Sequence, residues 1–271
     1  MLGGYWESVA IFLGINCLMG VSLYVPMSAG LISLGQGGFM AIGAYISAVL
    51  TEAGVPFAPA LAAGAAAAAA AGMVVGAPAL RIRGIYVMIL TFGFGEIVRV
   101  FFTNFDPTGG ASGLGGIHPL TQLWQIILAN IVAFLLIWRI RQLRFGRAMI
   151  AINEDDLAAE AMGVNLIRTK LLSFSLGAAV AGIAGGFYAH HALFIDANQF
   201  DFSRSAMAFL FVVLGGVANP FGPFVGATIV TLLPETLRFV QDWRMTVFGL
   251  LLMALAIWRP EGLLSGTRPS R

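Results

Sequence analysis

The segment Arg139–Lys170, RIRQLRFGRAMIAINEDDLAAEAMGVNLIRTK, is the one long polar stretch in an otherwise apolar chain. Its basic residues flank an acidic piece at 153–163. Asn153 can cap a helix over that piece, and Gly163, which precedes a β-branched residue, is a typical C′ stop. The helix dipole favours the carboxylates that would fill the first turn, which are Glu154, Asp155 and Asp156. The pattern predicts a short separate helix at 153–163, held away from the apolar bulk of the chain.

The composition around this segment is that of an integral membrane protein. Of the 271 residues, 59% are hydrophobic and 10% are charged, and the mean hydropathy is +0.88. A soluble domain carries about a quarter charged residues. A helical crossing needs about 20 apolar residues, which leaves room for about eight segments. The predicted segments are Val9–Val25, Met27–Leu50, Phe57–Leu80, Gly84–Phe102, Leu123–Trp138, Leu171–Tyr188, Ser205–Leu237 and Met245–Trp258. We therefore expect an all-α, polytopic bundle that forms one transmembrane domain over residues 1–271.

The distribution of basic residues predicts the orientation of the bundle. Short cytoplasmic loops are enriched in Lys and Arg. The segment 139–170 carries six basic residues. We therefore expect the loop 142–168 to face the cytoplasm and the loop 104–122 to lie on the outer side.

Two of the apolar segments are interrupted by helix-breaking residues. A single crossing by 205–237 would leave the basic C-terminal tail outside, against the positive-inside rule. A half-helix Ala206–Leu214, a Gly/Pro-rich turn at 215–223 and a return helix keep that tail cytoplasmic. Residues 27–50 likewise begin with a Gly- and Ser-rich half and continue as a regular helix. Paired breaks in two halves of a membrane protein indicate a transport path at their junction. We predict two broken or re-entrant helices.

Two segments carry small residues at four-residue spacing. These stripes are Gly64, Ala68, Gly72 and Gly76 in one segment, and Gly177, Ala181, Gly185 and Ala189 in the other. Small residues on one face let a neighbouring helix approach closely inside a membrane. The stripes predict tight packing within the bundle.

Enzymatic chemistry is not indicated in this chain. Lys170 is the only lysine, and no G-x-x-x-x-G-K-[ST] motif surrounds it, so a phosphate-cradling nucleotide site is excluded. His118, His190 and His191 fall in predicted outer loops without metal-ligand spacing, and Cys17 is the single cysteine. We expect no catalytic residue, no metal and no cofactor. A net charge of +2 is too small to indicate nucleic-acid binding.

Several polar residues inside the apolar segments are candidates for a transport path. Ionisable groups in a membrane are costly and are functional candidates by default. Glu96 lies three residues from Arg99, so the two form either a structural ion pair near the outer interface or part of the pathway lining. The other candidates are Ser33, Gln36, Thr91 and Asn219. Ser33, Gln36 and Asn219 lie in the breaks, where they either contact a polar solute or pack the break itself.

Four stretches resemble the permease subunits of branched-chain amino acid ABC importers, of the LivM type. They are GLISLGQGGFMAIGAY (30–45), LRIRGIYVMILTFGFGEIVR (80–99), GRAMIAINEDDLAAEAMGVNLIRTKLLSFSLGAAVAGIAGGFYA (146–189) and VLGGVANPFGPFVGATIVTLLPE (213–235). The resemblance implies that 153–163 is the coupling helix that docks on a cytoplasmic ATPase. The residues so assigned are Asn153, Glu154, Asp155, Asp156, Glu160, Ala161 and Gly163.

The resemblance also implies a set of partners and a location. The expected partners are a LivH-like second permease, two cytoplasmic ATPase subunits and a periplasmic solute-binding protein, assembled in the bacterial inner membrane. Relatives of this type also serve urea, short amides and aromatic acids, so these solutes are an alternative to branched-chain amino acids. An ATP-independent secondary transporter or channel and a non-transporting scaffold are further alternatives.

Overall fold

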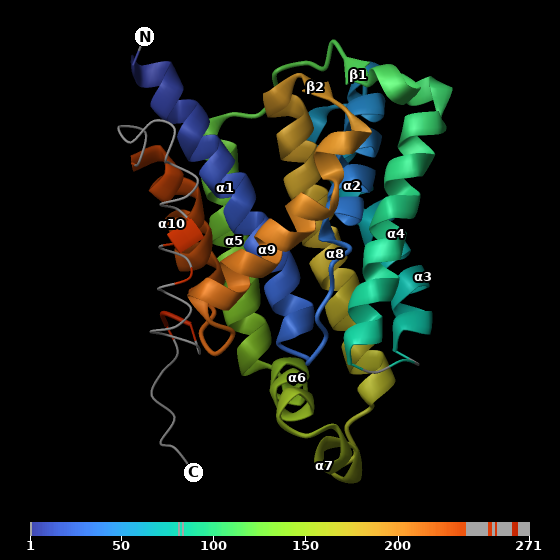
Figure 1. Ribbon diagram of the computed structural model, residues 1–271, viewed down its shortest axis with the longest axis vertical. Helices are drawn as coiled ribbons and strands as arrows, with labels where there is room; N and C mark the ends of the chain where they lie inside the picture. Colours follow the sequence, from blue (N-terminus) through green and yellow to red (C-terminus); the bar gives the residue numbers. More distant parts are fainter. Residues whose placement is uncertain are drawn as a thin grey trace.

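The computed structural model describes residues 2–80, 82, 84–236, 249–250, 253 and 262–264, and its secondary structure is almost entirely helical (Figure 1). In the described part of the chain, the α-helices are α1 (Leu2–Met27), α2 (Gln36–Glu52), α3 (Phe57–Ala79), α4 (Ile85–Asn104), α5 (Leu123–Gln142), α6 (Arg144–Glu154), α7 (Asp156–Ala161), α8 (Leu166–Ala192), α9 (Phe202–Gly215) and α10 (Gly222–Thr236). Most of the predicted segment Met245–Trp258 and of the basic tail, together with Arg81 and Arg83, lies outside the described residues.

Short elements join the loops at one end of the bundle. Between residues 84 and 236 the chain forms the 3₁₀ turns η1 (Asp106–Thr108), η2 (Gly110–Ser112) and η3 (Ala197–Phe200). The two-residue strands β1 (Leu114–Gly115) and β2 (Phe194–Ile195) pair antiparallel, with Leu114 opposite Ile195. This pairing ties the loop after α4 to the loop after α8. Figure 1 shows both strands at the upper end, opposite α6 and α7.

Within the described residues, five helices are long and apolar enough to cross a membrane, namely α1, α3, α4, α5 and α8. They are buried to very different extents. In α8, 72% of the most apolar stretch is buried, against 17% in α5. Helix α8 packs against α1, α2 and α3 and forms the centre of the bundle. The expectation of an all-α membrane protein is confirmed, while the count of about eight crossings stays a prediction.

The small-residue stripes explain why α8 occupies this position. A Cβ atom built on Gly185 would lie 1.9 Å from the carbonyl oxygen of Met40 in α2. One built on Gly177 would lie 2.3 Å from the carbonyl oxygen of Ser22 in α1. Gly72 of α3 faces Ala178 of α8 in the same way. The close helix approach predicted from both stripes is confirmed.

The two predicted interruptions coincide with gaps between helices. Residues 28–35, between α1 and α2, are not helical. Helices α9 and α10 are joined by a turn and pack side by side, because a Cβ atom on Gly226 would lie 1.9 Å from the carbonyl oxygen of Phe211. In Figure 1, α9 descends toward the end of the bundle that carries α6. The depth of either interruption in a bilayer stays a prediction.

Two sequence-based boundaries are wrong. The predicted helix 153–163 is not one helix, because α6 ends at Glu154 and α7 begins at Asp156. His190 and His191 lie in the last turn of α8 and not in a loop. His190 is fully buried, and its ring nitrogens contact the carbonyl oxygen of Gly186 at 2.8 Å and Oγ1 of Thr51 at 2.9 Å. Helix α8 therefore extends four residues beyond Tyr188, where the predicted segment ends.

Candidate functional site

Helices α6 and α7 lie beyond the ends of the long helices, at the lower end in Figure 1. Gly146, Met149 and Ile152 recur three residues apart along α6 and are buried, which fixes this helix against the bundle. Because that apolar face extends to Ile152, α6 continues through Asn153 and Glu154. Asn153 is therefore not a helix cap, and Glu154 is not in a first turn, contrary to the sequence-based expectation.

Asp155 caps α7 instead. Its backbone is extended, with φ −157° and ψ 112°. The carboxylate oxygen Oδ1 accepts hydrogen bonds from the backbone N–H groups of Leu157, at 2.8 Å, and Ala158, at 3.1 Å. Two N–H groups that the helix itself leaves unpaired are thereby satisfied.

The other end of α7 stops at Gly163, as predicted. Gly163 has φ +83°, a left-handed conformation that favours glycine. Its N–H donates to the carbonyl of Glu160 at 2.9 Å, and the N–H of Val164 donates to that of Ala159 at 3.1 Å. This pair of hydrogen bonds is the Schellman motif, which closes a helix C-terminus.

An ion pair holds α7 on the base of α8. Nζ of Lys170 lies 2.8 Å from Oδ2 of Asp156, and the Lys170 side chain is only 15% exposed. Ala159 is buried, whereas Glu160 and Ala161 are exposed. Helix α7 is thus attached along one face and free to solvent along the other.

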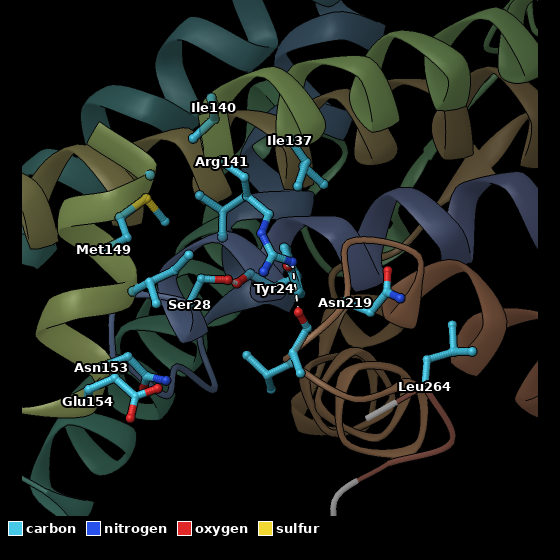
Figure 2. Close-up of a pocket in the computed structure, with 15 residues that line it drawn as sticks. Tyr24, Ser28, Ile137, Ile140, Arg141, Met149, Asn153, Glu154, Asn219 and Leu264 are labelled. Carbon is cyan, nitrogen blue, oxygen red and sulfur yellow. Dashed lines mark hydrogen bonds between the residues drawn. The ribbon is translucent and has the colours of Figure 1, made fainter. Parts of the chain in front are cut away.

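A cavity of about 620 Å³ opens beside α6. Its walls come from the ends of α1 and α5, from α6, and from residues 217–219 in the turn between α9 and α10. Figure 2 shows Arg141 pointing into the middle of this cavity, with Asn153 and Glu154 on one side and Asn219 on the other. The cavity lies where the predicted coupling segment meets the second interruption.

Arg141 joins three parts of the chain across this cavity. Its Nη1 donates to the hydroxyl oxygen of Tyr24 at 3.0 Å and to the carbonyl oxygen of Ala218 at 2.8 Å (Figure 2). Asn153 lies against the turn after α1, since a Cβ atom built on Gly30 would be 3.5 Å from its Oδ1 atom. The polar segment 139–170 therefore lies against both interruptions, through Asn153 at the first and Arg141 at the second.

Three of the candidate path residues lie together at the first interruption. Ser33, Gln36 and Thr91 are buried. Oγ1 of Thr91 accepts a hydrogen bond from the N–H of Leu34 at 3.0 Å. The amide oxygen of Gln36 accepts one from the hydroxyl of Ser22 at 3.3 Å. These contacts hold the non-helical backbone in place, and a role in solute contact stays a prediction.

The other two candidates lie elsewhere. Asn219 faces the cavity around Arg141, and its Oδ1 accepts a hydrogen bond from the N–H of Phe221 at 3.0 Å. The predicted pairing of Glu96 with Arg99 is confirmed by a distance of 2.8 Å between Oε2 and Nε. Nη1 of Arg99 also donates to Oδ1 of Asn198 in η3, at 2.9 Å. This pair therefore connects α4 to the loop after α8.

Comparison with known proteins identifies the family. The family model described as branched-chain amino acid transport system / permease component matches residues 5–256. The chain belongs to this permease family. It is similar to the LivM permease proteins of the high-affinity branched-chain amino acid transport systems of Escherichia coli and Salmonella typhimurium, at 35% and 34% identity. Each match covers 96% of this chain and 68% of the relative.

A second type of relative is also similar to the permease. The LivH permease protein of Escherichia coli is 29% identical over 52% of this chain and 46% of its own length. No solved structure matches the permease. The permease is a multi-pass protein of the inner (plasma) membrane, and its family consists of transport subunits and not of enzymes.

Sequence reasoning missed the exposed apolar side chains on α7 and at its C-cap. Leu157 is 71% exposed, and Met162 is 86% exposed. Two large apolar side chains within an otherwise polar segment are the signal in the sequence that could have indicated them. In the sequence, Arg141 indicates only the orientation of the bundle, as one of the six basic residues of the segment 139–170. Its contacts with Tyr24 and Ala218 span 117 and 77 residues of sequence, so no local pattern indicates them.

Proposed function

We propose that this permease is the LivM-like subunit of a binding-protein-dependent ABC importer for branched-chain or other hydrophobic amino acids. A LivH-like permease, two cytoplasmic ATPase subunits and a periplasmic solute-binding protein complete the assembly. Residues 1–271 act as one transmembrane domain. The bundle alternates between outward-open and inward-open states when the ATPases close and open.

One observation carries the proposal: a short capped helix, α7, stands at the end of the bundle and leaves large apolar side chains exposed on the helix and at its C-cap. Leu157 and Met162 leave large apolar surfaces in solvent, and exposed apolar patches with polar rims mark protein interaction sites. The Asp156–Lys170 ion pair and the Schellman turn give α7 a defined position relative to α8. A displacement of α7 by an ATPase would therefore move the bundle and not only the loop.

The route from α7 into the bundle runs through α6. Helix α6 contacts α5, α7 and α8. At the cavity its residue Asn153 touches the first interruption, and Arg141, just before α6, touches the second. Movement of α7 and α6 would thus reach both non-helical segments, about which we expect the bundle to rock. Glu96 and Arg99 would lie near the outer end of the solute path.

The proposal is tested by replacing Leu157 with Glu in the assembled complex. We expect Leu157→Glu to abolish co-purification of the ATPase subunits and the ATP-driven uptake of leucine, because a charge would be buried in the docking contact. Leu143→Glu is the matched control, since Leu143 is exposed at the same end of the bundle but lies outside α7. Equal retention of the ATPases by both variants would refute the docking role of α7.

A further inference from the structure

Among the described residues that line the cavity beside α6, Arg141 is the one cation, and its described hydrogen bonds do not go to a carboxylate. The hydrogen bonds from its Nη1 go to the hydroxyl of Tyr24 and the carbonyl of Ala218, which are both uncharged acceptors. Neither of the two ion pairs that join described residues includes Arg141. An arginine carries five N–H donors in a planar fork that matches a carboxylate. The described contacts engage one of its two terminal nitrogens.

The walls around Arg141 combine this charge with apolar surface. Ile137, Met149 and Val217 provide aliphatic contact, Ser28 and Asn219 provide hydrogen-bonding groups, and Glu154 adds a carboxylate to the wall on the α6 side. The volume of about 620 Å³ falls within the range of about 300–1,000 Å³ that is usual for small-molecule sites. In Figure 2 the labelled side chains surround Arg141 from α5, α6, the end of α1 and the 217–219 turn. A small zwitterion with an aliphatic part, which presents a carboxylate to Arg141, fits this combination of groups.

We propose that the cavity is a binding site for the carboxylate of a hydrophobic amino acid at the α6–α7 end of the permease. Arg141 binds the carboxylate through its second terminal nitrogen, and the aliphatic side chain packs against Ile137, Met149 and Val217. The identity of the ligand as the transported solute rests on the proposed function. An occupant here lies between α6 and the α9–α10 turn, so it is placed to sense or impede their relative movement.

Equilibrium binding of radiolabelled leucine tests the site. The assembled complex is placed in phosphatidylcholine nanodiscs without the solute-binding protein and without ATP. We expect saturable binding that unlabelled leucine displaces and that leucinamide, which lacks the carboxylate, does not. Arg141→Met should weaken binding roughly 10-fold or more, because it removes a charge-assisted hydrogen bond. Arg141→Lys should retain part of the affinity, since it retains the charge.

Arg147→Met is the matched control. Arg147 is exposed on α6 and donates to the carbonyl of Gln142, and it does not line the cavity. We expect this variant to bind leucine like the unaltered complex. A thermal unfolding midpoint of Arg141→Met that equals that of the control excludes general destabilisation as the cause. If the midpoint falls, the leucinamide comparison on the unaltered complex still decides the carboxylate requirement.

Several results would overturn the inference. They are absence of leucine binding at millimolar concentration, equal displacement by leucinamide, and equal affinity in Arg141→Met and Arg147→Met. Loss of leucine binding in phosphatidylglycerol nanodiscs would assign the site to a lipid phosphate and overturn it as well. Failure here is separable from failure of the proposed function. ATP-driven uptake with no leucine binding in this assay would refute only the proposed leucine site in the cavity. Absence of ATP-driven uptake would refute the proposed importer function.

Discussion

At the scale of single residues, Asp155 determines where α7 begins. Asp155→Ala removes the carboxylate that accepts from the N–H groups of Leu157 and Ala158. Loss of a helix cap costs about 1 kcal/mol. Helix α7 has only six residues, so this is a large share of its stability. About 1 kcal/mol is a factor of about five in the ratio of ordered to disordered α7, so we expect solute-stimulated ATP hydrolysis by the assembled complex to fall by at most about fivefold.

Asp155→Ser is the matched variant for this prediction. Serine retains a side-chain oxygen at the cap position and is among the preferred N-cap residues. Its ATP hydrolysis should stay close to that of the unaltered complex. If the serine and alanine variants lose the same activity, the cap is not what positions α7.

At the scale of elements, the crossing of α8 over α2 depends on the absence of a side chain at one point. A methyl group at position 185 would lie 1.9 Å from the carbonyl oxygen of Met40 and 2.9 Å from the backbone nitrogen of Ala44. Both atoms belong to backbone that cannot move without shifting α2. We expect Gly185→Ala to destabilise the permease by about 1–3 kcal/mol, the usual cost of overpacking. The thermal unfolding midpoint of the purified permease in detergent measures this effect.

Gly93→Ala is the control on a peripheral helix. A Cβ atom built at Gly93 in α4 meets nothing within 4 Å. Alanine has the higher helix propensity, so the unfolding midpoint should stay equal or rise slightly. A fall as large as that of Gly185→Ala would show that helical glycines matter here for a reason other than close packing.

At the scale of the whole molecule, the predicted orientation places α7 in the cytoplasm and the loop 104–122 outside. Cys17 is buried and is the only cysteine, so Cys17→Ala provides a background without thiols. In that background, a membrane-impermeant maleimide should label Leu157→Cys only in inside-out vesicles. It should label His118→Cys only in right-side-out vesicles, because His118 lies in the exposed loop before α5.

Labelling of both positions from the same side would contradict a single crossing of the membrane by α5, which lies between His118 and Leu157 in the sequence. Labelling of Leu157→Cys in right-side-out vesicles alone would invert the molecule. That result would remove the physical basis for coupling to a cytoplasmic ATPase.

Local features of the site could be predicted from the sequence because their causes are local. The Glu96–Arg99 pair follows from three-residue spacing on one helical face, and the Gly163 stop follows from the left-handed conformation that glycine accepts. The boundary near Asn153 could not be predicted in this way. Asn153 and Asp155 are both good caps, and the buried face of α6 up to Ile152 decided between them.

The sequence by itself determined that the chain is a helical membrane protein with a polar segment after Trp138 and small-residue stripes on two helices. Apolar runs and small residues at four-residue spacing are local patterns along the chain, so the sequence alone is enough to recognise them. Only the tertiary structure decided which helix lies in the centre, which polar residues meet at the first interruption, and that Arg141 joins Tyr24 to Ala218. Those contacts depend on the relative placement of helices, where long-range packing and the burial of polar groups outweigh local preference.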